Sequence, residues 1–137
     1  MTDFVLVLMR WLHISSAAIL VGGMLYGRVA LTPEGGSQAA EAWRDLLRRA
    51  ADRFRPVVYA AIPASLVSGI FKILISPGHS ARYHMLLGMK LLLVAHIFAT
   101  ALMVTTNKSK RPARAMAGAA ISGLIVIAIG AYLQRFP

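Results

Sequence analysis

Composition excludes most classes of soluble protein for this chain. It has 137 residues, of which 58% are hydrophobic and only 15% are charged, with a net charge of +10 and no cysteine. A soluble domain of this length could not cover so much apolar surface with so few charges. The missing cysteine excludes disulfides, cysteine-ligated zinc, iron–sulfur clusters and thiol catalysis. In so apolar a chain, the excess of Lys and Arg indicates the basic loops of a membrane protein and no nucleic-acid partner.

Four long apolar runs predict four membrane-spanning helices. They cover residues 4–27, 56–76, 83–105 and 113–134, and about 20 residues suffice to cross a bilayer. Only helices and closed barrels satisfy their backbone in lipid, and the runs lack the alternation of barrel strands. We therefore expect an all-α integral membrane fold, a four-transmembrane-helix bundle in the lipid bilayer, with residues 1–137 forming one domain.

The connecting segments predict the orientation. Basic residues concentrate in the first and third loops, namely Arg28, Arg44, Arg48, Arg49, Arg53, Arg55, Lys108, Lys110, Arg111 and Arg114. The opposite side carries only Arg82 and Arg135. Because basic loops stay in the cytoplasm, both termini should lie on the non-cytoplasmic side of a bacterial-type inner membrane.

Residues 37–55 predict a cytoplasmic amphipathic helix between the first and second spans. Trp43, Leu47 and Phe54 recur at helical spacing, and arginines occupy the other faces. Such a helix lies in the headgroup layer, either as an anchor for the second span or as a docking surface. Small residues of the first and fourth spans, such as Gly27 and Gly123, predict close helix packing.

Two histidines lie at membrane depth, where an ionisable residue marks function by default. His13 and His96 are on helices that run in the same direction, and their depths differ by only about 5 Å. Neutral imidazole binds haem iron, copper or zinc, so the pair predicts a haem held by both histidines. The alternative is that each histidine makes a hydrogen bond across the bundle to Ser, Thr or a carbonyl.

Basic residues in the same half of the membrane extend this prediction. Arg10, Lys72 and Lys90 have no Asp or Glu partner within the spans. An anionic ligand, such as the two propionates of haem, would supply the missing charge. The alternative is that these long side chains reach the headgroups.

Methionines offer a second ligand set. Met89, His96 and Met103 share one helix face, and thioethers together with imidazole suit Cu(I). The alternative is ordinary packing, the more common role of such a stripe.

Several short motifs resemble those of the CopD-like and HemJ-like small four-helix membrane proteins. They are Arg10-Trp11-Leu12-His13, Gly22-Gly23-Met24-Leu25, Leu87-Gly88-Met89-Lys90-Leu91 and Gly130-Ala131-Tyr132-Leu133. The resemblance implies a four-helix bundle. For the HemJ-like branch it implies b-type haem and the porphyrin redox chemistry of a protoporphyrinogen oxidase, with His13 and Lys90 matching the motif's His and Lys. For the CopD-like branch it implies copper transport.

The sequence thus predicts a b-type haem-binding protein in electron transfer, with His13, His96, Arg10 and Lys90 around the haem. Its redox partner would be a quinone, a porphyrin or another subunit of a larger membrane complex. Two alternatives stay open. One is copper transport through a His/Met path. The other is a cofactor-free accessory subunit that packs through its first and fourth helices, against other subunits or a second copy.

Overall fold

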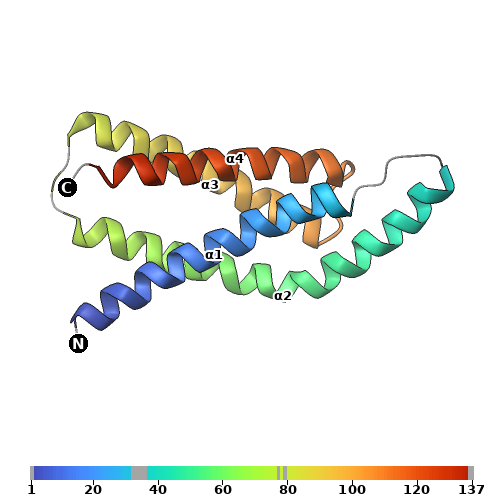
Figure 1. Ribbon diagram of the computed structural model, residues 1–137, viewed down its shortest axis with the longest axis horizontal. Coiled ribbons are helices and arrows are strands. Elements are labelled where there is room, and N and C mark those ends of the chain that lie inside the picture. Colours follow the sequence, from blue (N-terminus) through green and yellow to red (C-terminus); the bar gives the residue numbers. More distant parts are fainter. Residues whose placement is uncertain (1, 32–36, 77, 79, 136–137) are drawn as a thin grey trace.

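Long helices make up almost all of the molecule. The computed structural model describes residues 2–31, 37–76, 78 and 80–135. Within these residues it has four helices, α1 (Thr2–Ala30), α2 (Ser37–Ile75), α3 (Ala81–Thr105) and α4 (Pro112–Leu133). All four are long and apolar enough to cross a membrane, which confirms the predicted all-α, multi-pass class. The start of α1 and the end of α4 lie at one end of the molecule, and the α3–α4 turn lies at the other (Figure 1).

Helix α2 differs from the prediction, because it is one continuous helix of 39 residues. The sequence predicts a separate helix at residues 37–55 followed by a span at residues 56–76. In the structure the helix runs through Pro56, and it also contains Pro63. Proline removes a backbone hydrogen bond and bends a helix without necessarily ending it. Figure 1 shows α2 bending near its middle, so the amphipathic segment is the first half of this bent helix.

Glycines set how closely α1 approaches its neighbours. A Cβ atom at Gly123 of α4 would lie 2.5 Å from a methyl group of Val21 on α1, and one at Gly27 of α1 would lie 2.6 Å from the sulfur of Met116 on α4. The two helices therefore touch where a side chain is missing, as the small residues predict. Helix α1 also packs against α2, from Gly23, where a Cβ would lie 2.6 Å from the ring of Phe54, to His13, which bonds Ser68. Helix α1 thus runs obliquely between the two helices it contacts most (Figure 1).

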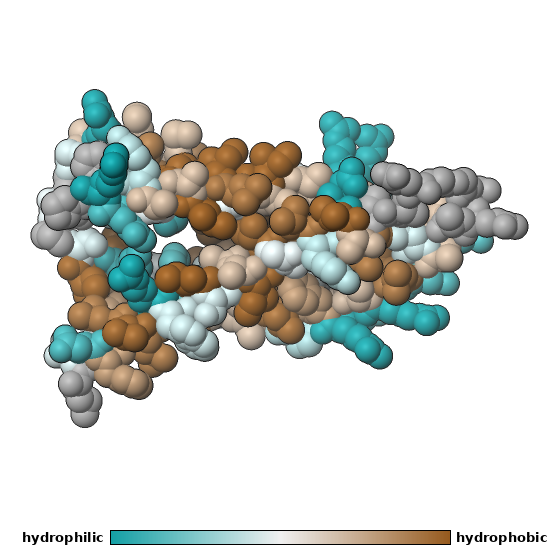
Figure 2. Space-filling model, viewed as in Figure 1, coloured by the Kyte–Doolittle hydropathy of each residue, from teal (hydrophilic) through white to brown (hydrophobic). Residues whose placement is uncertain are grey.

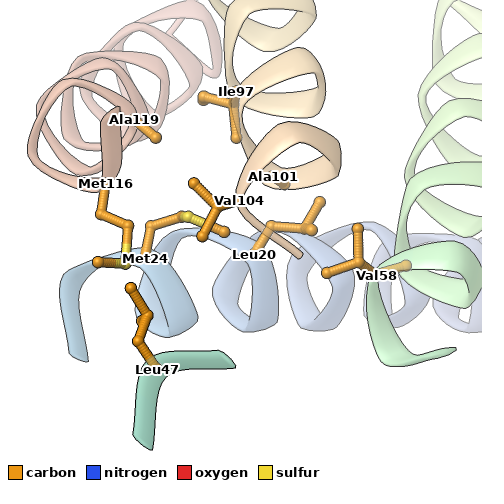
Figure 3. Packing of buried hydrophobic residues seen from close by; sticks show 10 residues of the cluster. Leu20, Met24, Leu47, Val58, Ile97, Ala101, Val104, Met116 and Ala119 are labelled. Atoms are coloured by element: carbon orange, nitrogen blue, oxygen red, sulfur yellow. The ribbon is translucent and has the colours of Figure 1, made fainter. Parts of the chain in front are cut away.

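The hydrophobic core lies in the half of the bundle that contains the α3–α4 turn, and all four helices contribute to it (Figure 3). Leu20 and Met24 of α1 are 1% and 2% exposed, and Ala101 and Ala119 of the other pair are fully buried. Leu47 belongs to the same cluster, with Trp43 and Phe54 packed against it. Apolar side chains of the first half of α2 therefore pack against the rest of the protein.

The turn between α3 and α4 is fixed by backbone hydrogen bonds. Asn107 adopts a left-handed conformation with φ 58°, and the following N–H of Lys108 donates to the carbonyl of Met103. This pattern closes the last helical turn. Arg55 also bonds the end of α3, because its Nε donates to the carbonyl of Thr105 at 2.8 Å. Its terminal nitrogen pairs with Asp52 at 2.7 Å. These contacts join the bend of α2 to the end of α3.

The surface has the distribution expected of a chain surrounded by lipid. Hydrophobic residues cover the middle of the face shown in Figure 2, and hydrophilic residues gather toward its two ends. Large apolar side chains such as Leu74 and Leu92 are more than 70% exposed. Such exposure is unusual for a monomeric soluble protein and ordinary for a membrane-spanning bundle.

Candidate functional site

A cavity of about 400 Å³ separates the two helix pairs near the end where α1 begins and α4 ends. His13 of α1, Ser65 of α2, Lys90 of α3 and Gly130 of α4 all line it, and we call it the His13 cavity. Most of its remaining wall is aliphatic or aromatic, including Leu87, Leu91, Val94 and Phe98. Figure 2 shows the molecule hollowed toward this end. Its size is within the usual range for small-molecule and cofactor sites.

His13 is held in the cavity wall by α2. Its Nδ1 lies 3.1 Å from Oγ of Ser68, and its Cε1 would lie 3.4 Å from a Cβ at Gly69. Ser68 is fully buried. The ring is half-buried and rests against a helix surface that has no side chain at the point of contact.

The hydrogen bonds of Ser68 assign the tautomer of His13. The single hydroxyl hydrogen of Ser68 donates to the carbonyl of Ala64 at 2.7 Å. Its oxygen must therefore accept from Nδ1–H of His13, which leaves the lone pair on Nε2. A histidine whose Nδ1–H is held in this way is oriented as a ligand or as a hydrogen-bond acceptor. The same network keeps Ser68 from acting as a nucleophile activated by His13.

Two lysines line the same cavity. Nζ of Lys90 would lie 3.4 Å from a Cβ at Gly130, so this half-buried side chain reaches across to α4. Lys72 of α2 is more exposed and also lines the wall. No carboxylate is among the described residues that line the cavity. Its charged groups are therefore cationic, which favours an anionic ligand.

Arg10 lies outside the His13 cavity. It is exposed and lines a neighbouring groove together with Lys72, Phe71 and Gln134. Lys72 is common to both hollows, so it connects Arg10 to the cavity. The sequence predicts Arg10, Lys72 and Lys90 as partners of an anion; in the structure Lys72 and Lys90 line the His13 cavity, and Arg10 lines the neighbouring groove.

His96 faces another part of the bundle. Its Nδ1 lies 3.1 Å from Oγ of Ser122 on α4, and its Cε1 would lie 3.7 Å from a Cβ at Gly118. The residue is exposed and is not among those that line the His13 cavity. Each membrane histidine thus bonds a serine of a different helix, as the hydrogen-bonding alternative predicts, and the structure does not bring the two rings into one cavity.

The methionine stripe lies on the outside of α3. Met89 and Met103 are 50% and 49% exposed, and they share this exposed face with His96. Within the described part of the chain, no three His, Asp or Glu side chains form a group that could hold a metal ion.

Sequence reasoning missed the residues that position His13. Ser65, Ser68 and Gly69 all lie on one side of α2 and line the cavity or contact the ring. The available signal was a pair of serines spaced by three residues and followed by glycine, within an apolar span. Polar side chains on one face of a membrane helix indicate that this face meets another polar group.

No protein-family model matches the chain, no curated protein is similar to it at a significant level, and no solved structure matches it at that level. The resemblance to CopD-like and HemJ-like proteins therefore rests on the short motifs alone, two of which contain the cavity residues His13 and Lys90.

Proposed function

We propose that this chain is a b-type haem-binding membrane protein that transfers electrons, and that the His13 cavity holds the haem. The observation that supports this is an oriented imidazole in an otherwise largely apolar cavity that also contains two lysines. Imidazole is the common axial ligand of b-type haem, and cations suit its two carboxylates. A haem bound there would supply one-electron transfer, with a quinone or another subunit of a membrane complex as its partner.

The donor set of the cavity fits this group. Nε2 of His13 keeps its lone pair because Nδ1–H bonds Ser68. Lys72 and Lys90 would pair with the propionates, since no carboxylate of the described cavity wall competes for them. Gly69 and Gly130 keep the wall flat beside His13 and Lys90. The apolar residues of α3 would exclude water. This would strengthen both the contact of His13 with the iron and the pairing of the lysines with the propionates.

His13 and His96 have different roles in this proposal. His13 is the ligand that the cavity supports. Coordination by His96 stays a prediction, which would require its ring to leave Ser122. Lys90 is the second residue that both the resemblance and the cavity bring to this site.

A visible spectrum of the purified protein tests the proposal. We expect a Soret band and a sharp α-band on reduction, and we expect His13→Ala to remove or shift both. His84→Ala is the matched control, because His84 is exposed and bonds the carbonyl of Ser80 at the start of α3. A colourless protein, or an unchanged spectrum in His13→Ala, would reject the proposal. Stoichiometric copper in a colourless protein would support the transport alternative, and His96→Ala tests for a second ligand.

The proposed orientation places the His13 cavity on the non-cytoplasmic side of a bacterial-type inner membrane. Basic residues are concentrated at the end that has the α3–α4 turn and the first half of α2. By the positive-inside rule this end faces the cytoplasm. The first half of α2 would then lie in the cytoplasmic headgroup layer, with its arginines toward the lipid headgroups.

A further inference from the structure

A second cavity, of about 460 Å³, lies at the end of the molecule opposite the His13 cavity. The first half of α2, the end of α3 and the start of α4 enclose it. Its floor is apolar and contains Trp43, Leu47 and Val104. Its rim carries five cationic side chains, Arg44, Arg48, Lys110, Arg111 and Arg114. We call it the basic cavity.

No carboxylate among the described residues lines the basic cavity. The one ion pair among the described residues joins Arg55 to Asp52, and neither of these residues is in the lining. Cations that converge on a concave surface with a low-dielectric floor concentrate an anion there.

Two backbone N–H groups in the wall add hydrogen-bond donors for such an anion. Helix α4 begins at Pro112, and its N-cap residue Arg111 makes no side-chain capping bond. The first-turn N–H groups of Ala113 and Arg114 therefore lack intrahelical acceptors, and both residues line the cavity. A helix N-terminus attracts phosphate through these groups and through its dipole.

Trp43 forms part of the floor of the basic cavity. Its indole Nε1 is buried and has no hydrogen-bond partner among the described residues, and a buried donor without an acceptor costs free energy. Because Nε1 is closed off from the cavity in this structure, a ligand oxygen would reach it only after the ring turns.

The depth of the basic cavity indicates where the ligand comes from. Asn107 at the end of α3 lies 3.3 Å from Asp52, so these residues are at one level. Arg48 precedes Asp52 by one helical turn, a distance of about 6 Å along the axis of the first half of α2, which is oblique in Figure 1. The headgroup layer of a bilayer is about 5–7 Å thick on each side. From these observations, we infer that the basic cavity binds the phosphate group of an anionic phospholipid.

Tryptophan fluorescence tests this inference in the purified protein. In a Trp11→Phe background Trp43 is the one remaining tryptophan, and it reports directly on the cavity. The probes are short-chain phosphatidylglycerol, short-chain phosphatidylcholine and inorganic phosphate, each titrated into protein in a neutral detergent. We expect a saturable change in Trp43 emission with phosphatidylglycerol and a much weaker response to phosphatidylcholine.

Paired variants separate the cavity from general surface charge. Arg44→Gln with Arg48→Gln removes two rim cations and should weaken phosphatidylglycerol binding about 30-fold. Arg49→Gln with Arg53→Gln removes the same charge from the same helix outside the lining and should leave binding within about twofold. Lys110→Gln and its neighbour Lys108→Gln repeat the comparison on the α3–α4 turn, so a folding defect in one pair does not end the test.

Each outcome has a definite meaning. Preferential binding of phosphatidylglycerol, lost only in the lining variants, supports the lipid as the ligand. Equally tight binding of inorganic phosphate, lost in the same variants, supports the phosphate site and assigns it to a soluble phosphate compound. Equal losses in the lining and control pairs, or equal binding of the two lipids, would show non-specific attraction and overturn the inference.

Discussion

Replacing Gly123 with alanine should destabilise the bundle at the crossing of α1 and α4. The new Cβ would lie 2.5 and 2.7 Å from the two methyl carbons of Val21 and 3.1 Å from its Cβ. Carbon atoms in ordinary contact are about 3.5–4.0 Å apart, so the helices would have to separate by about 1 Å. Val21 cannot move aside easily, because a β-branched side chain in a helix has one strongly preferred rotamer.

The size of this effect follows from two opposing contributions. Overpacking a well-filled interface costs about 1–3 kcal/mol, and the contact with Cβ of Val21 places this case near the upper value. Alanine gains up to about 1 kcal/mol over glycine inside a helix. We therefore expect Gly123→Ala to lower the free energy of unfolding by about 2 kcal/mol. Gly22→Ala is the matched control, since a Cβ there meets nothing within 4 Å, and it should be neutral or stabilising.

Unfolding in mixed detergent micelles, followed by circular dichroism while the fraction of dodecyl sulfate rises, measures both variants. Adding Val21→Ala to Gly123→Ala should recover part of the lost stability, because it removes the methyl groups that clash. Equal stabilities of Gly123→Ala and Gly22→Ala would refute the packing argument. An additive double variant, without recovery, would show that the cost arises elsewhere.

Three further predictions address the site, the turn and the orientation. Under the haem proposal, Ser68→Ala should weaken haem retention about 10- to 100-fold while leaving the fold intact, because His13 loses the acceptor that orients it; haem content after dialysis measures this. Arg55→Gln should cost about 1–2 kcal/mol in the same unfolding assay, since a charged donor to the last turn of α3 is lost. A cysteine at Ser80 should react with an impermeant thiol reagent in intact cells and one at Ser109 should not; the reverse pattern would invert the proposed orientation.

Much of the fold follows from the sequence because hydropathy and length decide it. The four apolar runs are each long enough for one crossing, and the structure has a helix over every one of them. The joining of the two predicted helices into the single helix α2 was harder to predict from the sequence. Pro56 is compatible with a helix end, a first helical turn or a bend, and the choice depends on packing, here of Leu47, Phe54 and Val58 onto the common core.

The candidate site was only partly predictable. Counting residues predicts His13, His96 and Lys90 near one level, since each residue advances a helix by a fixed rise, and in the structure His13 and Lys90 line one cavity while His96 does not. Which way a side chain faces depends on the angle at which the helix is packed. That angle is set by contacts such as His13 with Ser68 and His96 with Ser122, which lie far apart in sequence. For this reason Lys90 joins His13 in the cavity while His96 turns to α4.

The small residues of α1 and α4 connect the packing of the bundle to its cavity. Where Gly27 and Gly123 remove side chains, α1 lies directly against α4 and the core closes around Leu20 and Met24. Helix α1 also contacts α2 there, with Phe54 beside Gly23, and toward its first residues it meets α2 where Ser68 and Gly69 receive His13. The helix pairs α1–α2 and α3–α4 separate there, and the His13 cavity fills the space between them. A single oblique helix thus seals one half of the bundle and opens the other. Under the haem proposal, substitutions at its crossing with α4 should therefore alter haem retention as well as stability.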